Sequence, residues 1–115
     1  MVVLPNLYGD ILSDAAAALT GGLGLAASAC YGDDYAYFES AHGTADDIAG
    51  LGIVNPTATM LSAALLLDHL AFSDAAAALD DAISAVYADG RALTPDQGGT
   101  ATTEAFADAV IGRLP

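Results

Sequence analysis

Two aspartates near the start of the chain, Asp10 and Asp14, have the spacing of a metal-binding pair. Residues four apart lie on the same face of a helix, so their carboxylates approach within bridging distance. Two like charges repel there unless a cation lies between them, and oxygen ligands of this kind suit Mg²⁺ or Mn²⁺. The spacing also allows a structural role, in which Asp10 caps the helix and Asp14 is a surface acid near the positive end of the helix dipole.

The segment from His42 to Pro56 is a glycine-punctuated polar loop that runs into a helix start. Main-chain N–H groups at a helix N-terminus suit a phosphate-bearing ligand. An acid at a fixed place in such a loop can accept hydrogen bonds from both ribose hydroxyls, which favours NAD over a 2′-phosphorylated cofactor. A structural role is also open for two of these residues. His42 can be a loop histidine with satisfied hydrogen bonds, and Asn55 can be the N-cap of the next helix.

Three motifs occur in order along the chain: Asn6–Asp14, His42–Pro56 and Thr94–Thr100. Together they resemble the C-terminal part of the β-decarboxylating hydroxyacid dehydrogenases, which include 3-isopropylmalate, homoisocitrate and isocitrate dehydrogenases. The resemblance covers nearly the whole chain, so residues 1–115 are expected to form one unit. It implies an α/β fold in which this C-terminal segment contributes strands to a larger mixed sheet and packs helices around it.

The resemblance also implies roles for individual residues. Asp10 and Asp14 would hold the Mg²⁺ or Mn²⁺ that chelates the hydroxyl and carboxylate of the substrate and stabilises negative charge on it. Asp47 would hold the adenosine ribose of NAD, with Ile48 packed beside it. The remaining residues expected to bind the cofactor are Glu39 near its nicotinamide end, His42, Gly43, Thr44, Ala45 and Asn55 against its adenosine half, and Asp96 in the loop that covers the adenosine.

Two departures from the family pattern concern the same loop. The residue before the ribose-binding acid is usually proline, whereas this chain has Asp46, so the loop is expected to be less rigid. No lysine or arginine follows, so nothing would neutralise a 2′-phosphate, and this supports NAD as the cofactor.

Basic residues are nearly absent from the chain, which has two arginines and no lysine. A hydroxy di- or tricarboxylate substrate calls for bidentate arginines, which the family carries, with its catalytic tyrosine and lysine, before this segment begins. We therefore assign no catalytic residue and expect the chain alone to be inactive, supplying the NAD loop and part of the metal site. 3-Isopropylmalate is the favoured substrate, because Thr94-Pro95-Asp96 and the position of Asp47 resemble the NAD-using branch of the family. Homoisocitrate, isocitrate, or a non-catalytic truncated fragment or accessory subunit are the alternatives.

The composition excludes several partners. A net charge of −13 argues against nucleic acid or an anionic membrane, because both need clustered Lys and Arg. Such an acidic surface is tolerable where salt screens it, so we expect a salt-rich cytoplasm. The single Cys30 suggests a reducing compartment and is expected to be a small buried residue. The chain has no basic segment followed by an apolar one, so we expect no secretory signal, and its longest apolar run, Met60 to Leu67, is too short to span a bilayer.

The motifs need elements to position them. Helical spacing and glycine stops predict a helix over residues 10–20, in which Ala15–Leu19 is a candidate contact surface of a homodimer. The segment over residues 23–32 is expected to be extended before it turns. Further expected elements are strands over residues 1–4 and 35–39, a helix from Pro56 to about Leu70, a helix from Ser73 to Gly90, and a helix from Thr103 to Gly112.

Overall fold

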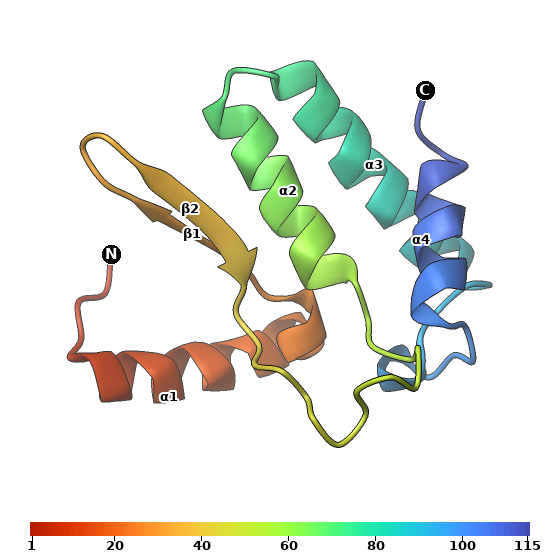
Figure 1. The fold of residues 1–115 in the computed structure, drawn as a ribbon, viewed down its shortest axis with the longest axis horizontal. Helices are drawn as coiled ribbons and strands as arrows, with labels where there is room; N and C mark the ends of the chain where they lie inside the picture. Colours follow the sequence, from red (N-terminus) through yellow and green to blue (C-terminus); the bar gives the residue numbers. More distant parts are fainter.

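Two short strands form an antiparallel hairpin in the N-terminal half of the chain (Figure 1). The strands are β1 (Ala27–Tyr31) and β2 (Ala36–Ser40), and their register places Ser28 opposite Glu39. The computed structural model describes residues 1–115, with four helices besides this hairpin. The predicted α/β class and the strand near residues 35–39 are therefore confirmed.

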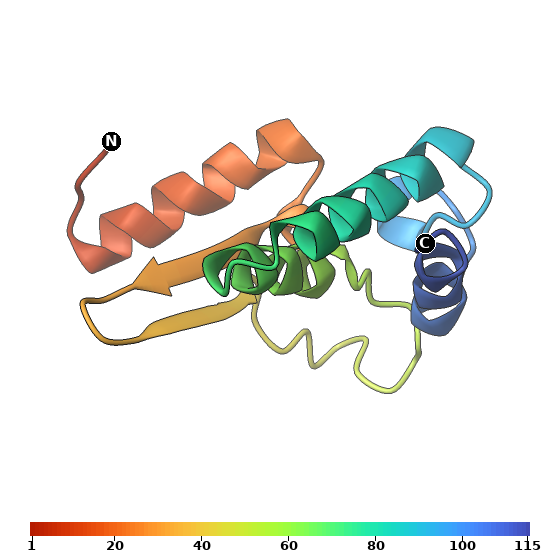
Figure 2. The same ribbon diagram turned by 90° about the horizontal axis from the view of Figure 1, so that it is seen from above.

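Helix α2 (Thr57–His69) lies against the hairpin and is followed by α3 (Ser73–Asp89), which returns beside it (Figures 1 and 2). At the end of α2, the His69 ring lies 5.5 Å from the Tyr31 ring and 5.6 Å from the Phe38 ring, measured between centroids. Buried Ser62 of α2 donates a hydrogen bond of 2.6 Å to the carbonyl oxygen of Glu39. These contacts fix the hairpin on α2.

The buried core lies between α3 and α4 (Thr103–Ile111). Helix α3 ends at the expected Gly90, and α4 begins at the expected Thr103. Gly90, with φ of +72°, ends α3 in the left-handed region, which glycine adopts readily. Thr102 caps α4 by accepting a hydrogen bond of 3.1 Å from the N–H of Ala105. The core side chains are Ala82, Ile83, Val86, Phe106 and Val110.

Helix α1 (Asn6–Ala17) lies apart from this core and buries only Ala17. A 3₁₀ turn continues it to Thr20, so the predicted helix is confirmed, but it begins four residues earlier than expected. The radius of gyration is 14.8 Å, against about 13 Å for a compact domain of this length. The molecule is therefore open at the α1 end, and apolar side chains such as Ile11 and Leu19 are exposed there.

Other expectations for the N-terminal third are wrong. Residues 1–4 form no strand, because no other strand lies beside them to accept their hydrogen bonds. Cys30 is exposed rather than buried, because side chains alternate along β1 and Cys30 lies on the face opposite Tyr31, whose ring contacts His69 of α2. The segment expected to be extended from residue 23 begins with a 3₁₀ turn, Leu23–Leu25, before β1.

None of the helices combines the length and the apolar character that crossing a membrane requires.

We expect Phe106→Ala to destabilise the fold by about 3–5 kcal/mol, because the ring is fully buried and its loss leaves a cavity in a small core. Thermal unfolding followed by circular dichroism measures the change. Phe72→Ala removes the same side chain from an exposed site and should have little effect. Equal losses in the two variants would contradict this placement of the core.

Candidate functional site

An acidic cavity of about 500 Å³ lies between α1, the hairpin and the start of the following loop. The carboxylates of Asp10 and Asp14 have no hydrogen bond or ion pair within the protein. Both are therefore free to bind a cation. The residues that line the acidic cavity are Asp10, Ser13, Asp14, Ser28, Glu39, Ser40, Ala41, His42 and Gly43.

The structural alternative for Asp10 is wrong, because α1 begins at Asn6 and Asp10 lies inside the helix rather than at its cap. Two unpaired carboxylates four residues apart fit one divalent cation that takes oxygen ligands. No group of three or more His, Cys, Asp or Glu side chains in the chain is close enough to hold an ion. The donor set of this chain therefore fits part of a metal site.

A second cavity, the loop cavity, has a volume of about 390 Å³ and lies under the loop from His42 to Val54. Its walls are largely apolar, with a few polar groups, as in cavities that bind small molecules. His42 and Gly43 line both cavities, so the two spaces adjoin at these residues. The residues that line the loop cavity are Leu23, Gly24, His42, Gly43, Ala45, Ile48, Ile53, Val54, Asn55, Pro95 and Asp96.

Asn55 is buried at the base of the loop cavity, where its side chain joins three segments. Its Oδ1 accepts a hydrogen bond of 3.0 Å from the N–H of Thr57, the first residue of α2, but the N-cap is Pro56 and the expectation that Asn55 occupies that position is wrong. Its Nδ2 donates to the carboxylate of Asp96 at 3.0 Å and to the hydroxyl of Tyr87 at 3.1 Å. The amide of Asn55 is therefore fully engaged inside the protein.

Asp96 lies in a 3₁₀ turn over Pro95–Gln97, and three side chains donate to its carboxylate. Thr94 donates to Oδ1 at 2.6 Å, and Asn55 and Gln97 donate to Oδ2 at 3.0 Å. Burial acts to raise the pKa of Asp96, but these hydrogen bonds favour the ionised form and hold the pKa below the ordinary value of 3.8. The carboxylate is thus held ionised at the edge of the loop cavity.

The backbone of the loop from His42 to Val54 is tightly turned. Ala45, with φ of +49°, adopts the left-handed conformation, which is uncommon outside glycine and is a form of backbone strain found at functional sites. The far end of the loop is tied to α4, because the N–H of Thr103 donates to the carbonyl oxygen of Gly52 at 2.8 Å. His42 Nδ1 lies 2.9 Å from the carbonyl oxygen of Gly43, so Nδ1 carries the proton and a neutral ring presents Nε2 as an acceptor.

The two cavities bring together most of the residues that the sequence singles out. Asp10, Asp14 and Glu39 line the acidic cavity, while Ala45, Ile48, Asn55 and Asp96 line the loop cavity. Thr44 and Asp47 line neither cavity and are exposed on the outer side of the same loop. Their contact with a cofactor stays a prediction.

Sequence reasoning missed Gly24, which forms part of the wall of the loop cavity. A Cβ atom at this position would lie 3.3 Å from both the Asn55 side chain and the Asp96 carboxylate, so a larger residue would crowd them. The glycine-rich run over residues 21–24 was the available signal for such a close approach.

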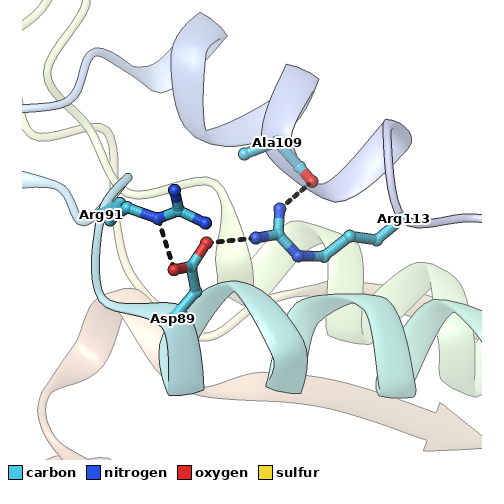
Figure 3. A network of polar contacts seen from close by, with 4 residues as sticks. All are labelled: Asp89, Arg91, Ala109 and Arg113. Atoms are coloured by element: carbon cyan, nitrogen blue, oxygen red, sulfur yellow. Dashed lines mark hydrogen bonds and ion pairs between the residues drawn. The ribbon is translucent and has the colours of Figure 1, made fainter.

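Both basic side chains of the chain are engaged at one place (Figure 3). Arg91 and Arg113 each form an ion pair of 2.5 Å with Asp89 at the end of α3, and Arg113 also donates to the carbonyl oxygen of Ala109. Neither arginine lines the acidic cavity or the loop cavity. Bidentate recognition of a substrate carboxylate by this chain's own arginines is therefore not available at either site.

Comparison with known proteins supports this geometry. Residues 1–110 match the family model described as isocitrate/isopropylmalate dehydrogenase. The chain is 55% identical, over 99% of its length, to the isocitrate/homoisocitrate dehydrogenase of Thermus thermophilus, of which it covers 34%. It is 48% identical, over 99% of its length, to the alpha subunit of the mitochondrial isocitrate dehydrogenase [NAD] of Sus scrofa, of which it covers 31%. The crystal structure of isocitrate dehydrogenase from Methylococcus capsulatus superposes on it with a TM-score of 0.90 at 47% identity, covering 95% of this chain and 33% of that one.

The ionised state of Asp96 should make the stability depend on pH. Because its pKa is lower in the folded than in the unfolded chain, its contribution is present above the unfolded value and is lost as the pH falls through the folded value. We therefore expect Asp96→Asn to lower the melting temperature at neutral pH, with a difference from the wild type that shrinks toward about pH 2. Asp80→Asn removes a carboxylate that has no hydrogen bond in the protein and serves as the control. A difference for Asp96→Asn that stays constant with pH would contradict this assignment.

Proposed function

Because the chain belongs to the isocitrate/isopropylmalate dehydrogenase family, we propose that it supplies the NAD-binding side and two metal ligands of a β-decarboxylating dehydrogenase. Members of this family are NAD(P)-dependent enzymes that act on hydroxy acids, use a divalent metal and form dimers. The chain spans about a third of the length of the relatives described above, 34% for the Thermus protein. The activity proposed here is therefore that of the whole enzyme, to which these residues contribute.

One observation carries the proposal: a metal-competent acidic cavity adjoins a largely apolar loop cavity at His42 and Gly43. A hydride acceptor must lie beside the substrate carbon that it oxidises, so its binding site has to adjoin the metal that holds the substrate. We assign the loop cavity to the adenosine half of NAD, against Ile48, Asn55 and Asp96. Glu39, in the acidic cavity, is then on the side of the nicotinamide.

Asp10 and Asp14 would hold the divalent ion in the acidic cavity, where both carboxylates are free. When bound, Mg²⁺ or Mn²⁺ supplies Lewis-acid stabilisation of negative charge on a substrate oxygen. The two carboxylates would neutralise the charge of the ion and hold it at one face of α1. His42, at the junction with the loop cavity, presents a ring nitrogen to the same space.

The names of the relatives bear on the substrate. The sequence favours 3-isopropylmalate, but the relatives described above are named isocitrate and homoisocitrate dehydrogenases, which supports the alternative substrates better. We propose isocitrate or homoisocitrate, oxidised at the hydroxyl carbon and then decarboxylated. Because Arg91 and Arg113 are engaged with Asp89, cations from outside these residues would bind the substrate carboxylates.

The environment and the assembly are proposals of the same kind. We propose a homodimer that uses the candidate contact surface Ala15–Leu19 at the end of α1, where every residue except Ala17 is exposed. The net charge of −13 and the single exposed Cys30 support a reducing, salt-rich cytoplasm.

The metal assignment is tested by Mn²⁺ binding to the chain itself, measured by electron paramagnetic resonance. Asp10→Asn and Asp14→Asn should each weaken binding about tenfold or more, because each leaves a single carboxylate on the ion. The double variant should lose much less than the sum of the two, because both residues bind the same ion.

Asp108→Asn, an exposed carboxylate on α4, is the matched control and should leave Mn²⁺ binding unchanged. Additive losses, or a loss of the same size in the control, would show that Asp10 and Asp14 do not form one site.

The cofactor assignment is tested by the affinities for NAD and NADP, measured by calorimetry. The chain should prefer NAD, because Asp47 would face a 2′-phosphate with a like charge. Asp47→Lys should shift the ratio of the two dissociation constants about tenfold or more toward NADP, since an unfavourable contact becomes a favourable one.

Asp46→Lys makes the same charge change at the neighbouring position and should leave the ratio almost unchanged. A wild type that binds NADP as tightly as NAD, or an equal shift in both variants, would rule out the ribose role of Asp47.

A further inference from the structure

Tyr87 reaches from the buried core to the base of the loop cavity without lining it. Its ring packs on Phe106 of α4, with the two centroids 5.5 Å apart. Its hydroxyl lies 2.7 Å from Oγ1 of Thr57 and 3.1 Å from Nδ2 of Asn55. A phenylalanine would fill the same place in the core, so packing alone does not require the hydroxyl.

The hydroxyl completes the hydrogen bonding of the Asn55 amide. One hydrogen of Nδ2 goes to Asp96 and the other to Tyr87, while Oδ1 accepts from the N–H of Thr57. The hydroxyl of Tyr87 accepts from Asn55, which leaves its own hydrogen for Thr57. A flipped amide would turn its oxygen toward the Asp96 carboxylate, so this set of partners fixes one orientation.

We propose that Tyr87 is a positioning residue for cofactor binding: its hydroxyl locks the Asn55 amide, and through it the Asp96 carboxylate, at the wall that meets the adenosine. The inference rests on the proposed function, in which the loop cavity takes the adenosine half of NAD. Tyr87 itself does not touch the cofactor. Tyr87 links the packed α3–α4 core to Asn55, and through Asn55 to Asp96, and both of these residues line the loop cavity.

The size of the effect follows from the bonds that remain. Without the hydroxyl of Tyr87, Asp96 keeps its bonds from Thr94 and Gln97, and Gln97 is itself anchored on the carbonyl oxygen of Gly21 at 3.0 Å. The wall of the loop cavity becomes less ordered but keeps these hydrogen bonds. We expect Tyr87→Phe to weaken adenosine binding about three- to tenfold, the value of one hydrogen bond.

The test compares AMP and nicotinamide mononucleotide as probes, titrated into the chain and followed by ¹H–¹⁵N NMR below the melting temperature of every variant. Tyr87→Phe should weaken AMP and leave nicotinamide mononucleotide unchanged. It should also shift the side-chain amide signals of Asn55 and raise the pKa of Asp96, because a less ordered amide stabilises the ionised carboxylate less. Ile83→Val, a buried change on the same helix, is the control for general loss of stability and should alter none of these.

Each outcome has a distinct meaning. Unchanged AMP affinity and unchanged Asn55 signals in Tyr87→Phe would overturn the role of Tyr87 and leave the proposed function intact. A wild-type chain that does not bind AMP would overturn the assignment of the loop cavity and this inference with it. If Tyr87→Phe does not fold, Thr57→Val, which removes the other partner of the hydroxyl, should shift the same readouts in the same direction, and no shift would overturn the proposal.

Discussion

The buried side chain of Asn55 is the contact on which the arrangement of the loop cavity depends. Through it, the start of α2, the turn that carries Asp96 and the last turn of α3 meet at one amide, although they are up to 41 residues apart in the sequence. An unpaired buried amide would cost more than its bonds contribute, so the three segments are held together by the need to satisfy a single group. The geometry of the cavity wall is a consequence of this requirement.

The distribution of charge divides the molecule into two regions. Its two arginines converge on Asp89, at the end of α3, and Arg113 also donates to the carbonyl oxygen of Ala109 in the last turn of α4. The acidic cavity keeps its carboxylates without any cationic neighbour of its own. Asp10 and Asp14 are left uncompensated within the protein, which supports the proposed role of the pair as ligands of a cation supplied from outside.

The sequence predicted the features that depend on local chemistry. Gly90 ends α3 through its own backbone as expected, and α2, α3 and α4 begin within one residue of the expected positions. The sequence did not predict the features that depend on residues far along the chain. Residues 1–4 have strand-forming side chains but no strand beside them, and the exposure of Cys30 depends on which face of the hairpin packs on α2. Most residues of the candidate site could be predicted because they lie in contiguous motifs. Gly24 and Tyr87 could not, because each is tied to the site by a contact with Asn55, which lies 31 residues from Gly24 and 32 residues from Tyr87.

The core and the loop proposed to bind the cofactor occupy different stretches of the chain, and this separation bears on how such a protein can evolve. The core cluster of α3 and α4 lies between residues 82 and 110, while most residues of the loop from His42 to Val54 are exposed. Substitutions at the exposed positions of that loop leave this cluster untouched, so they are nearly neutral for stability. Selection can therefore change what the loop recognises in small steps, without first having to find compensating changes in the core.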